Sequence, residues 1–131
     1  MNNELNPPTG FEVMADFNRL YSAYLESRKG KLWKCAVVRF EVNVLENIMF
    51  LHFMLTKHKY RPSPYNYFLV HEPKERLIMY NGFRDKIIQH SLCDNVLGPL
   101  LSKTFVYDNY ASQKGKGTHF GLDRLKSFMQ R

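Results

Sequence analysis

Hydrophobic residues spaced three and four positions apart predict a helix near the start of the chain. Thr9 and Glu12 have the spacing of a capping box, and Met14, Phe17, Tyr21 and Tyr24 follow at helical intervals. Lys29-Gly30 supplies a cationic last turn and a glycine stop. We therefore expect a helix from near Thr9 to near Ser27, after a short leader over residues 1–8.

A second and longer apolar pattern runs from Leu32 to about His58. Its main stripe recurs every three or four positions, at Trp33, Val37, Phe40, Val44, Ile48, Leu51 and Leu55. A second stripe widens the apolar surface and consists of Val38, Val42, Leu45, Met49 and Phe53. The pattern predicts one long helix that packs against more than one neighbour, and so implies a partner or a further domain.

The pattern changes after Arg61-Pro62-Ser63-Pro64, where prolines end the helix. Tyr67–Val70 and Arg76–Tyr80 are β-prone runs around Glu72-Pro73-Lys74-Glu75, which predicts a two-stranded hairpin. A further helix is expected with Asn81 as its cap and with apolar positions at Phe83, Ile87, Ile88 and Leu92. Gly98-Pro99 marks a break or a restart of the helical segment.

Small and polar residues predict a loop over Ser112–Gly117, and Thr118 can cap a last helix that carries Phe120, Leu122, Leu125, Phe128 and Met129. No stop signal precedes Arg131, so the chain is expected to be cut within an element. The element order predicts one α+β unit over 9–131, mainly helical with a two-stranded antiparallel hairpin. Its parts are helices over 9–60, the hairpin over 66–80, and helices with a loop over 81–131.

Composition narrows the class of partner. The 131 residues are 44% hydrophobic and carry a formal charge of +7, which favours a polyanion: nucleic acid, anionic lipid or nucleotide phosphate. Cys35 and Cys93 are too few for a disulfide framework, so a reducing cytoplasm is expected. The longest apolar stretch, Ile48–Leu55, is too short to span a membrane, and neither a membrane partner nor a signal peptide is predicted.

Cations gather on and just after the predicted hairpin. Lys74 and Arg76 alternate with Glu75 and precede Arg84 and Lys86. Lysine offers a mobile point charge and arginine a planar fork, and both can neutralise phosphate charge during phosphoryl transfer. The alternative is an ordinary solvated hairpin.

The segment Tyr110–Thr118 can cradle a nucleic-acid backbone. Gly115 and Gly117 let the main chain approach a strand closely, while Lys114, Lys116 and the amides at a helix start attract phosphate. A solvated loop explains the same pattern. A phosphate-binding P-loop is excluded, because that motif needs Lys directly before Ser or Thr and Gly117 intervenes here.

No enzyme active site is recognisable in the sequence. His90 and Cys93 can share a helix face, but a closed zinc site needs four ligands and no second pair lies nearby. Paired catalytic carboxylates are missing, and the serines have no nucleophile-elbow context.

Three segments read together resemble the first conserved blocks of bacterial reverse transcriptases. They are His71-Glu72-Pro73-Lys74-Glu75-Arg76-Leu77-Ile78, Phe83-Arg84-Asp85-Lys86-Ile87-Ile88-Gln89-His90, and Tyr110-Ala111-Ser112 through Thr118-His119. The similarity is greatest to the enzymes of diversity-generating retroelements and group II introns. About half of the chain carries these motifs, and the two preceding helices fit the family's N-terminal extension loosely.

The resemblance implies a role for each motif. Lys74 and Arg76 would approach the phosphates of the incoming dNTP, and Arg84 would brace the site or the template. Ser112, Lys114, Gly115, Lys116 and Gly117 would contact the RNA template. The implied partners are an RNA template, a DNA primer, dNTP and the palm domain of a parent chain.

The family's catalytic aspartates have no counterpart here. They lie downstream, in a block with an isolated Asp and in a Tyr-x-Asp-Asp turn of the palm, where Mg²⁺ is expected. The nearest echo, Tyr107-Asp108-Asn109, has no adjacent carboxylate pair, and two-metal catalysis needs such carboxylates. The chain is thus expected to be a fingers region that ends before the palm, needs no cofactor itself and does not polymerise.

Three hypotheses follow from the sequence. The first is the fingers region of an RNA-directed DNA polymerase, in which surface left bare by the palm permits self-association into a homo-oligomer. The second is a stand-alone nucleic-acid-binding module without polymerase activity. The third is a structural protein that uses the long apolar helix to oligomerise.

Overall fold

The structure is a computed structural model that describes residues 9–111, 113 and 115–130. The predicted leader over 1–8 and the loop residues Ser112 and Lys114 lie outside the described residues. The chain divides into two compact units, Met1–Pro99 and Leu100–Arg131, and each is described by itself. It is mainly helical with one two-stranded antiparallel sheet, which confirms the α+β class. The assignment of 9–131 to a single fingers subdomain stays a prediction.

The predicted first helix is two helices, α1 (Gly10–Ala15) and α2 (Phe17–Arg28). The capping box is confirmed, since the Thr9 amide donates to Glu12 Oε2 (2.7 Å) and the Glu12 amide to Thr9 Oγ1 (3.3 Å). The break falls at Asp16, whose extended backbone (ψ 137°) ends α1 and whose carboxylate accepts from the Arg19 amide at 3.2 Å. Gly30, with φ of +67°, follows the end of α2 as the glycine stop predicts.

The prediction of one long helix over 32–58 is wrong. The segment forms α3 (Cys35–Glu41) and α4 (Val44–Thr56), separated at Asn43, whose backbone is not helical (φ −131°, ψ 54°). The side-chain amide of Asn47 donates to the Phe40 carbonyl at 3.0 Å and so helps to satisfy the end of α3. Trp33 precedes α3 and is 77% exposed, so it does not extend the buried stripe.

The core of the first unit lies where α2 packs along α5 (Phe83–Leu92), with α1 and α4 packed around this pair. Most of the predicted main stripe is buried there, so both halves of the broken helix turn apolar side chains inward. His52 of α4 donates through Nδ1 to the Ala15 carbonyl at 2.7 Å, which ties α4 to the end of α1. The core cluster consists of Met14, Ala15, Leu20, Ala23, Tyr24, Phe40, Ile48, Leu51, Leu55, Ile87 and Ile88.

The second apolar stripe is exposed along its whole length. Its members are Val38, Val42, Leu45, Met49 and Phe53. The sequence prediction that a further neighbour covers this stripe therefore stays a prediction.

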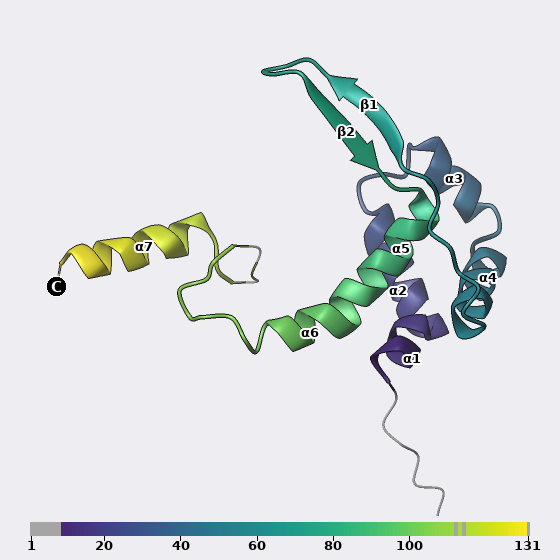
Figure 1. Ribbon diagram of the computed structural model, residues 1–131, viewed down its shortest axis with the longest axis horizontal. Coiled ribbons are helices and arrows are strands. Elements are labelled where there is room, and N and C mark those ends of the chain that lie inside the picture. Colours follow the sequence, from purple (N-terminus) through teal and green to yellow (C-terminus); the bar gives the residue numbers. More distant parts are fainter. Residues whose placement is uncertain (1–8, 112, 114, 131) are drawn as a thin grey trace, which may run out of the picture. The chain divides into compact units, whose positions relative to one another are not determined.

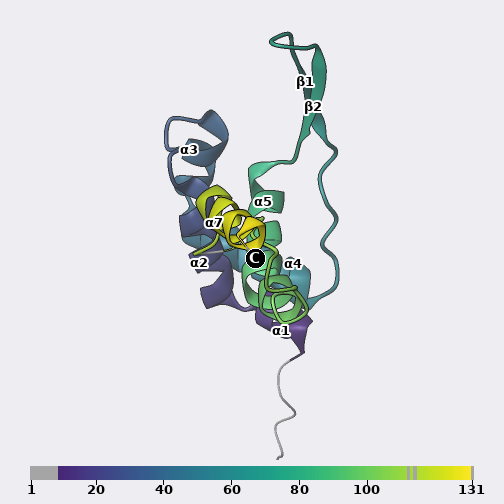
Figure 2. The ribbon, with the colours of Figure 1, turned by 90° about the vertical axis from the view of Figure 1, so that its left-hand side faces the viewer.

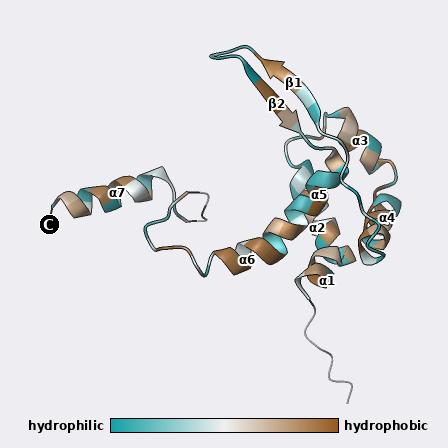
Figure 3. Ribbon diagram, in the orientation of Figure 1, coloured by the Kyte–Doolittle hydropathy of each residue, from teal (hydrophilic) through white to brown (hydrophobic). Residues whose placement is uncertain are grey.

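The hairpin forms as predicted, from β1 (Asn66–Val70) and β2 (Arg76–Tyr80). The strands are antiparallel, and their register places Asn66 opposite Tyr80 and Val70 opposite Arg76. The ribbon projects from the helices of its unit (Figures 1 and 2), although its strands are largely apolar (Figure 3). Large apolar side chains on both of its faces are exposed: Tyr67, Phe68, Leu69, Leu77, Ile78, Met79 and Tyr80.

The chain stays helical beyond α5, through the π-helical turn η1 (Cys93–Leu97) and α6 (Gly98–Leu101). The N-cap of α5 is Gly82 and not the predicted Asn81. Gly98-Pro99 restarts the α pattern instead of ending the helical run. The Gly98 amide donates to the Cys93 carbonyl, five residues back, just before Pro99, which has no amide hydrogen to donate.

The second unit contains α7 (Thr118–Met129), preceded by the predicted loop. Its N-cap is Gly117, so Thr118 is the first helical residue and not the cap. Within the described residues, no helix has the length and apolar character needed to cross a membrane.

Two buried serines provide a matched test of the core. Ser91 Oγ donates to the Met14 carbonyl at 2.8 Å, whereas Ser27 Oγ has no hydrogen-bond partner among the described residues. We expect Ser91→Ala to lower the free energy of unfolding by about 1 to 2 kcal/mol, because it leaves a buried carbonyl without this donor. Ser27→Ala should leave stability unchanged or raise it by up to about 1 kcal/mol. Urea denaturation followed by circular dichroism measures both, and equal losses would contradict the assignment.

Candidate functional site

The predicted hairpin cations are exposed at the turn and at the start of β2. Lys74 lies in the turn, and Arg76 is the first residue of β2. Within the described part of the chain, neither forms an ion pair. Glu72 and Glu75 flank them, so the formal charge of the hairpin is zero. The hairpin therefore offers two separate cationic groups and not a strong net field.

A buried carboxyl group holds the base of the hairpin. Asp85 of α5 is 2% exposed, and its two oxygens accept hydrogen bonds from the Tyr60 hydroxyl and from the Ser63 amide (3.2 Å). Tyr60 and Ser63 lie between α4 and β1, whereas Asp85 lies in the first turn of α5, the helix that follows β2. Both ends of the hairpin are thus fixed to one side chain, a role that the sequence analysis did not assign to Asp85.

Arg84 takes part in a cationic hollow beside this network. It lines a pocket of about 240 Å³ together with Lys59, Tyr60 and Arg61, over a floor from α4. Among the residues that the structure describes, no carboxylate lines this pocket. Lys59 and Arg61 were not predicted as site residues, because the sequence shows them only as the polar end of a helix. The three cations can neutralise a phosphate, and the Tyr60 ring adds an aromatic surface.

The glycine-lysine loop belongs to the second unit. Gly115 has φ of +75°, a left-handed conformation that favours glycine, whereas Gly117 is extended (φ −176°). Lys116 Nζ donates to the Tyr107 carbonyl at 2.5 Å and lies 4.5 Å from the centre of the Tyr107 ring. Lys116 therefore holds its own loop together, and contact with a template stays a prediction for it and for both glycines.

A hollow of about 530 Å³ opens beside this loop. It is lined by Tyr110, Ala111, Lys116, Gly117, Thr118, Gly121, Leu122 and Leu125. Gly121 is needed there, because a Cβ at this position would lie 2.8 Å from Cε2 of the Tyr110 ring. The hollow combines an aromatic ring, on which a base of a single-stranded nucleic acid can stack, with a lysine, which can neutralise the charge of a phosphate.

Asp108, the nearest echo of the family's catalytic motif, is bound to an arginine. Arg124 Nε lies 2.6 Å from Oδ1 and its Nη2 lies 3.1 Å from Oδ2. The hydrogen bond from Arg124 lowers the pKa of Asp108, although desolvation opposes the shift. Among the described residues, no group of three or more His, Cys, Asp or Glu side chains could hold a metal ion. Asp108 thus braces the second unit through Arg124.

The pair His90 and Cys93 lies at the end of α5 and the start of η1. His90 Nδ1 lies 3.8 Å from Asp94 Oδ2, and Cys93 is exposed at the start of η1. The sequence expectation of a structural or surface role for both is compatible with this arrangement.

The Asp85 network gives a test of stability and of its pH dependence. We expect Tyr60→Phe to lower the free energy of unfolding by about 2 kcal/mol at neutral pH, the value of a hydrogen bond to a charged group. Burial, and then the hydrogen bond to Asp85, raise the pKa of Tyr60 above its usual 10.0. The folded state therefore keeps this proton longer than the unfolded state, so stability falls as pH rises above about 10.

Urea titrations across this pH range measure the effect. The fall should be smaller in Tyr60→Phe than in the wild type, and Tyr65→Phe, at an exposed position, serves as the matched control. Equal stability of the two variants would contradict the role of Asp85.

Gly121 gives a test of the loop unit. Gly121→Ala should destabilise α7 by about 1 kcal/mol. Displacement of the Tyr110 ring costs about 1 to 3 kcal/mol, and the higher helix propensity of alanine offsets about 1 kcal/mol of this cost. Gly117→Ser is the control, because a Cβ at Gly117 meets nothing within 4 Å and serine is a favourable N-cap. Amide hydrogen exchange in α7 measures the effect. Equal exchange in the two variants would contradict the close contact with Tyr110.

Comparison with known proteins adds no further identification. Neither the models of known protein families nor the curated proteins give a match to this chain. The likeness to reverse transcriptases therefore stays an interpretation of the motifs.

Proposed function

We propose that this chain is the nucleic-acid-binding fingers region of an RNA-directed DNA polymerase similar to bacterial reverse transcriptases. In this role it holds the template and the phosphates of the incoming dNTP, and it does not polymerise by itself. Lys74 and Arg76 serve the dNTP, whereas Arg84 and the loop with Gly115, Lys116 and Gly117 serve the template.

The observation that carries the proposal is the cationic hollow at the base of the hairpin. Lys59, Arg61 and Arg84 line it, with no carboxylate among the described lining residues, and the hairpin that Asp85 anchors emerges from the same segments. Such a hollow favours a polyanion over a neutral ligand, because its positive charges attract phosphates. Phosphate contacts supply most of the affinity of nucleic-acid binding. The order of hairpin, Arg-Asp-Lys helix and glycine-lysine loop supports the choice of polymerase family.

The chemical step is assigned to other residues than those in this chain. Two-metal phosphoryl transfer needs carboxylates that share Mg²⁺, and the 131 residues contain no Asp-Asp pair. Asp108 does not fit such a site, because Arg124 already engages both of its oxygens. The contribution of this region is positioning and electrostatic stabilisation of phosphates.

A hairpin with two exposed apolar faces supports the presence of a covering polypeptide. An isolated two-stranded ribbon is only marginally stable in water, and burial of its apolar side chains would stabilise it. The palm domain of a parent chain is the proposed cover. The alternative is a stand-alone nucleic-acid-binding module, which shares the phosphate contacts but needs no palm. An open reading frame after codon 131 with an isolated Asp and a Tyr-x-Asp-Asp turn would favour the polymerase.

Salt-dependent binding tests the phosphate contacts. We expect the chain to bind a short RNA template annealed to a DNA primer, with an affinity that falls steeply between about 50 and 200 mM salt. The double variant Lys74→Gln/Arg76→Gln should bind more weakly, and its salt slope should fall by about 1 for each lost phosphate contact. Fluorescence anisotropy with a labelled primer measures both quantities.

The control is Lys57→Gln/Lys126→Gln, which removes two exposed cations elsewhere and leaves the same formal charge of +5, since 7 − 2 = 5. Equal losses in the two double variants would show that only net charge matters. Affinity independent of salt would overturn the proposed function.

A further inference from the structure

A dense run of positive charge lies outside the hairpin and the glycine-lysine loop. Residues 28–39 contain Arg28, Lys29, Lys31, Lys34 and Arg39 and no acidic residue. Arg28 pairs with Glu41 (3.2 Å) and Lys29 with Glu26 (2.6 Å). Lys31 and Lys34, in the turns between α2 and α3, form no ion pair among the described residues. Arg39 forms none there either, so three of the five cations of this run lack a counter-charge among the described residues.

One of these two lysines, Lys31, lies close to Lys86 of α5, since both line one pocket. Lys86 is half-buried, and burial, followed by the charges of Lys31 and Lys34, lowers the pKa of its ammonium group. Lys86 also forms no ion pair within the described residues. Repulsion among like charges and loss of hydration both cost free energy, and a bound multivalent anion would offset that cost.

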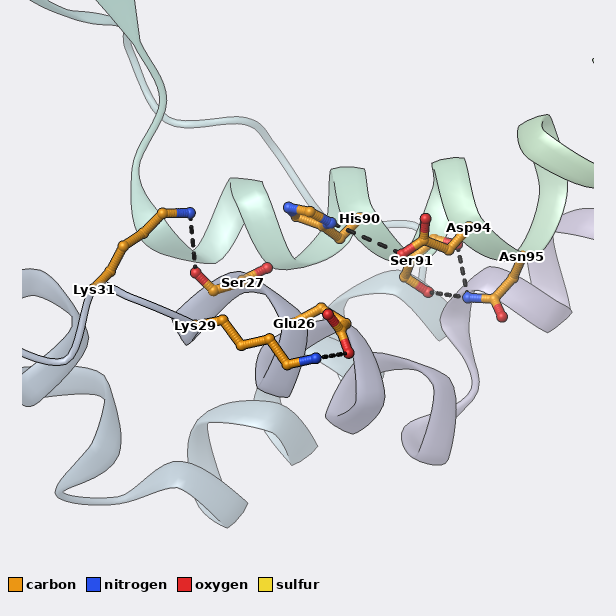
Figure 4. A network of polar contacts seen from close by, with 8 residues as sticks. All are labelled: Glu26, Ser27, Lys29, Lys31, His90, Ser91, Asp94 and Asn95. Carbon is orange, nitrogen blue, oxygen red and sulfur yellow. Dashed lines mark hydrogen bonds and ion pairs between the residues drawn. The ribbon is translucent and has the colours of Figure 1, made fainter. Parts of the chain in front are cut away.

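A pocket of about 450 Å³ lies between these elements. Lys31, Lys86, Gln89, His90, Cys93 and Asp94 line it. Lys31 Nζ donates to the Ser27 carbonyl at 3.3 Å, which holds the ammonium group against the end of α2 (Figure 4). Gln89 and His90 add groups that can donate hydrogen bonds.

The one carboxylate in the lining is directed to another partner. Asp94 faces His90 across 3.8 Å (Figure 4). It follows Lys86 by eight residues, or about 12 Å along a helix axis, so it does not neutralise the lysines directly. The lysine end of the pocket is therefore cationic.

We propose that this pocket binds a phosphate group of a nucleic-acid strand through Lys31 and Lys86. Lysine ammonium groups are compact point charges that suit a tetrahedral phosphate, whereas a planar carboxylate is better matched by the arginine fork. The proposal adds a contact that the hairpin and the loop do not provide. Only the choice of a strand over a free phosphate compound rests on the proposed function.

Titration with inorganic phosphate tests the pocket without nucleic acid. At constant ionic strength, the backbone amide NMR signals of Lys86, Gln89 and His90 should shift and saturate in the wild type. The shifts should persist in Lys57→Gln/Lys126→Gln and disappear in Lys31→Gln/Lys86→Gln, which has the same formal charge of +5, since 7 − 2 = 5. Equal shifts in both variants, or no saturable shift in the wild type, would overturn the pocket.

Lys31→Gln alone is a second variant that keeps the test decisive if the double variant fails to fold. Lys31 lines the pocket from the turn after α2, and its ammonium group contacts the Ser27 carbonyl at the end of that helix. The phosphate affinity of this variant should fall by several fold. Unchanged affinity would overturn the pocket.

Two further ligands identify the source of the phosphate. Affinity for a single-stranded RNA of about 12 nucleotides should fall about tenfold in Lys31→Gln/Lys86→Gln and remain in the control. If the double variant loses affinity for dCTP but not for the RNA, the pocket binds a free nucleotide, and the assignment to a nucleic-acid strand is overturned. If the wild type binds no RNA but keeps its phosphate shifts, the proposed function fails and the pocket stands.

Discussion

The arrangement of the first unit depends on the carboxyl group of Asp85. This group is buried in the helical core, and burial of an ionisable group costs several kcal/mol unless hydrogen bonds compensate. The Tyr60 hydroxyl and the Ser63 amide supply that compensation from the segment before β1. Because Asp85 itself follows β2, the same contacts decide where the hairpin leaves the helices and which cations lie at its base.

The placement of charge follows from this arrangement. Lys59 and Arg61 flank Tyr60 and Arg84 precedes Asp85, so the hydrogen bonds of Asp85 bring the cations together in one hollow. Lys86 follows Asp85 and points to a different pocket, with Lys31. Arg84 and Lys86 thus contribute to two cationic sites, because residues two positions apart are rotated by about 200° around the axis of a helix.

Local signals in the sequence were sufficient for part of this structure. The Thr9 capping box and the two strands involve residues close in sequence, and both predictions are confirmed. The long helix was predicted wrongly, since its apolar spacing continues through Asn43 although the backbone turns there. The hairpin cations Lys74 and Arg76 are exposed, and their contact with phosphates stays a prediction. The hydrogen-bond partners of Asp85 are 22 and 25 residues away in the sequence. These contacts, and the shared pocket of Lys31 and Lys86, depend on tertiary packing, which a sequence pattern does not show.

The hairpin has a consequence that concerns its backbone. Within the described part of the chain the sheet has two strands, so each strand pairs along one side and presents the other edge. An open edge is a template for strand addition by another chain, and apolar side chains on both faces strengthen such pairing. The cations at the turn oppose it, since edge lysines are a common defence against strand addition. The ribbon that we propose for phosphate contacts is therefore also a place where another chain can add a strand, and its solubility depends on what covers these edges.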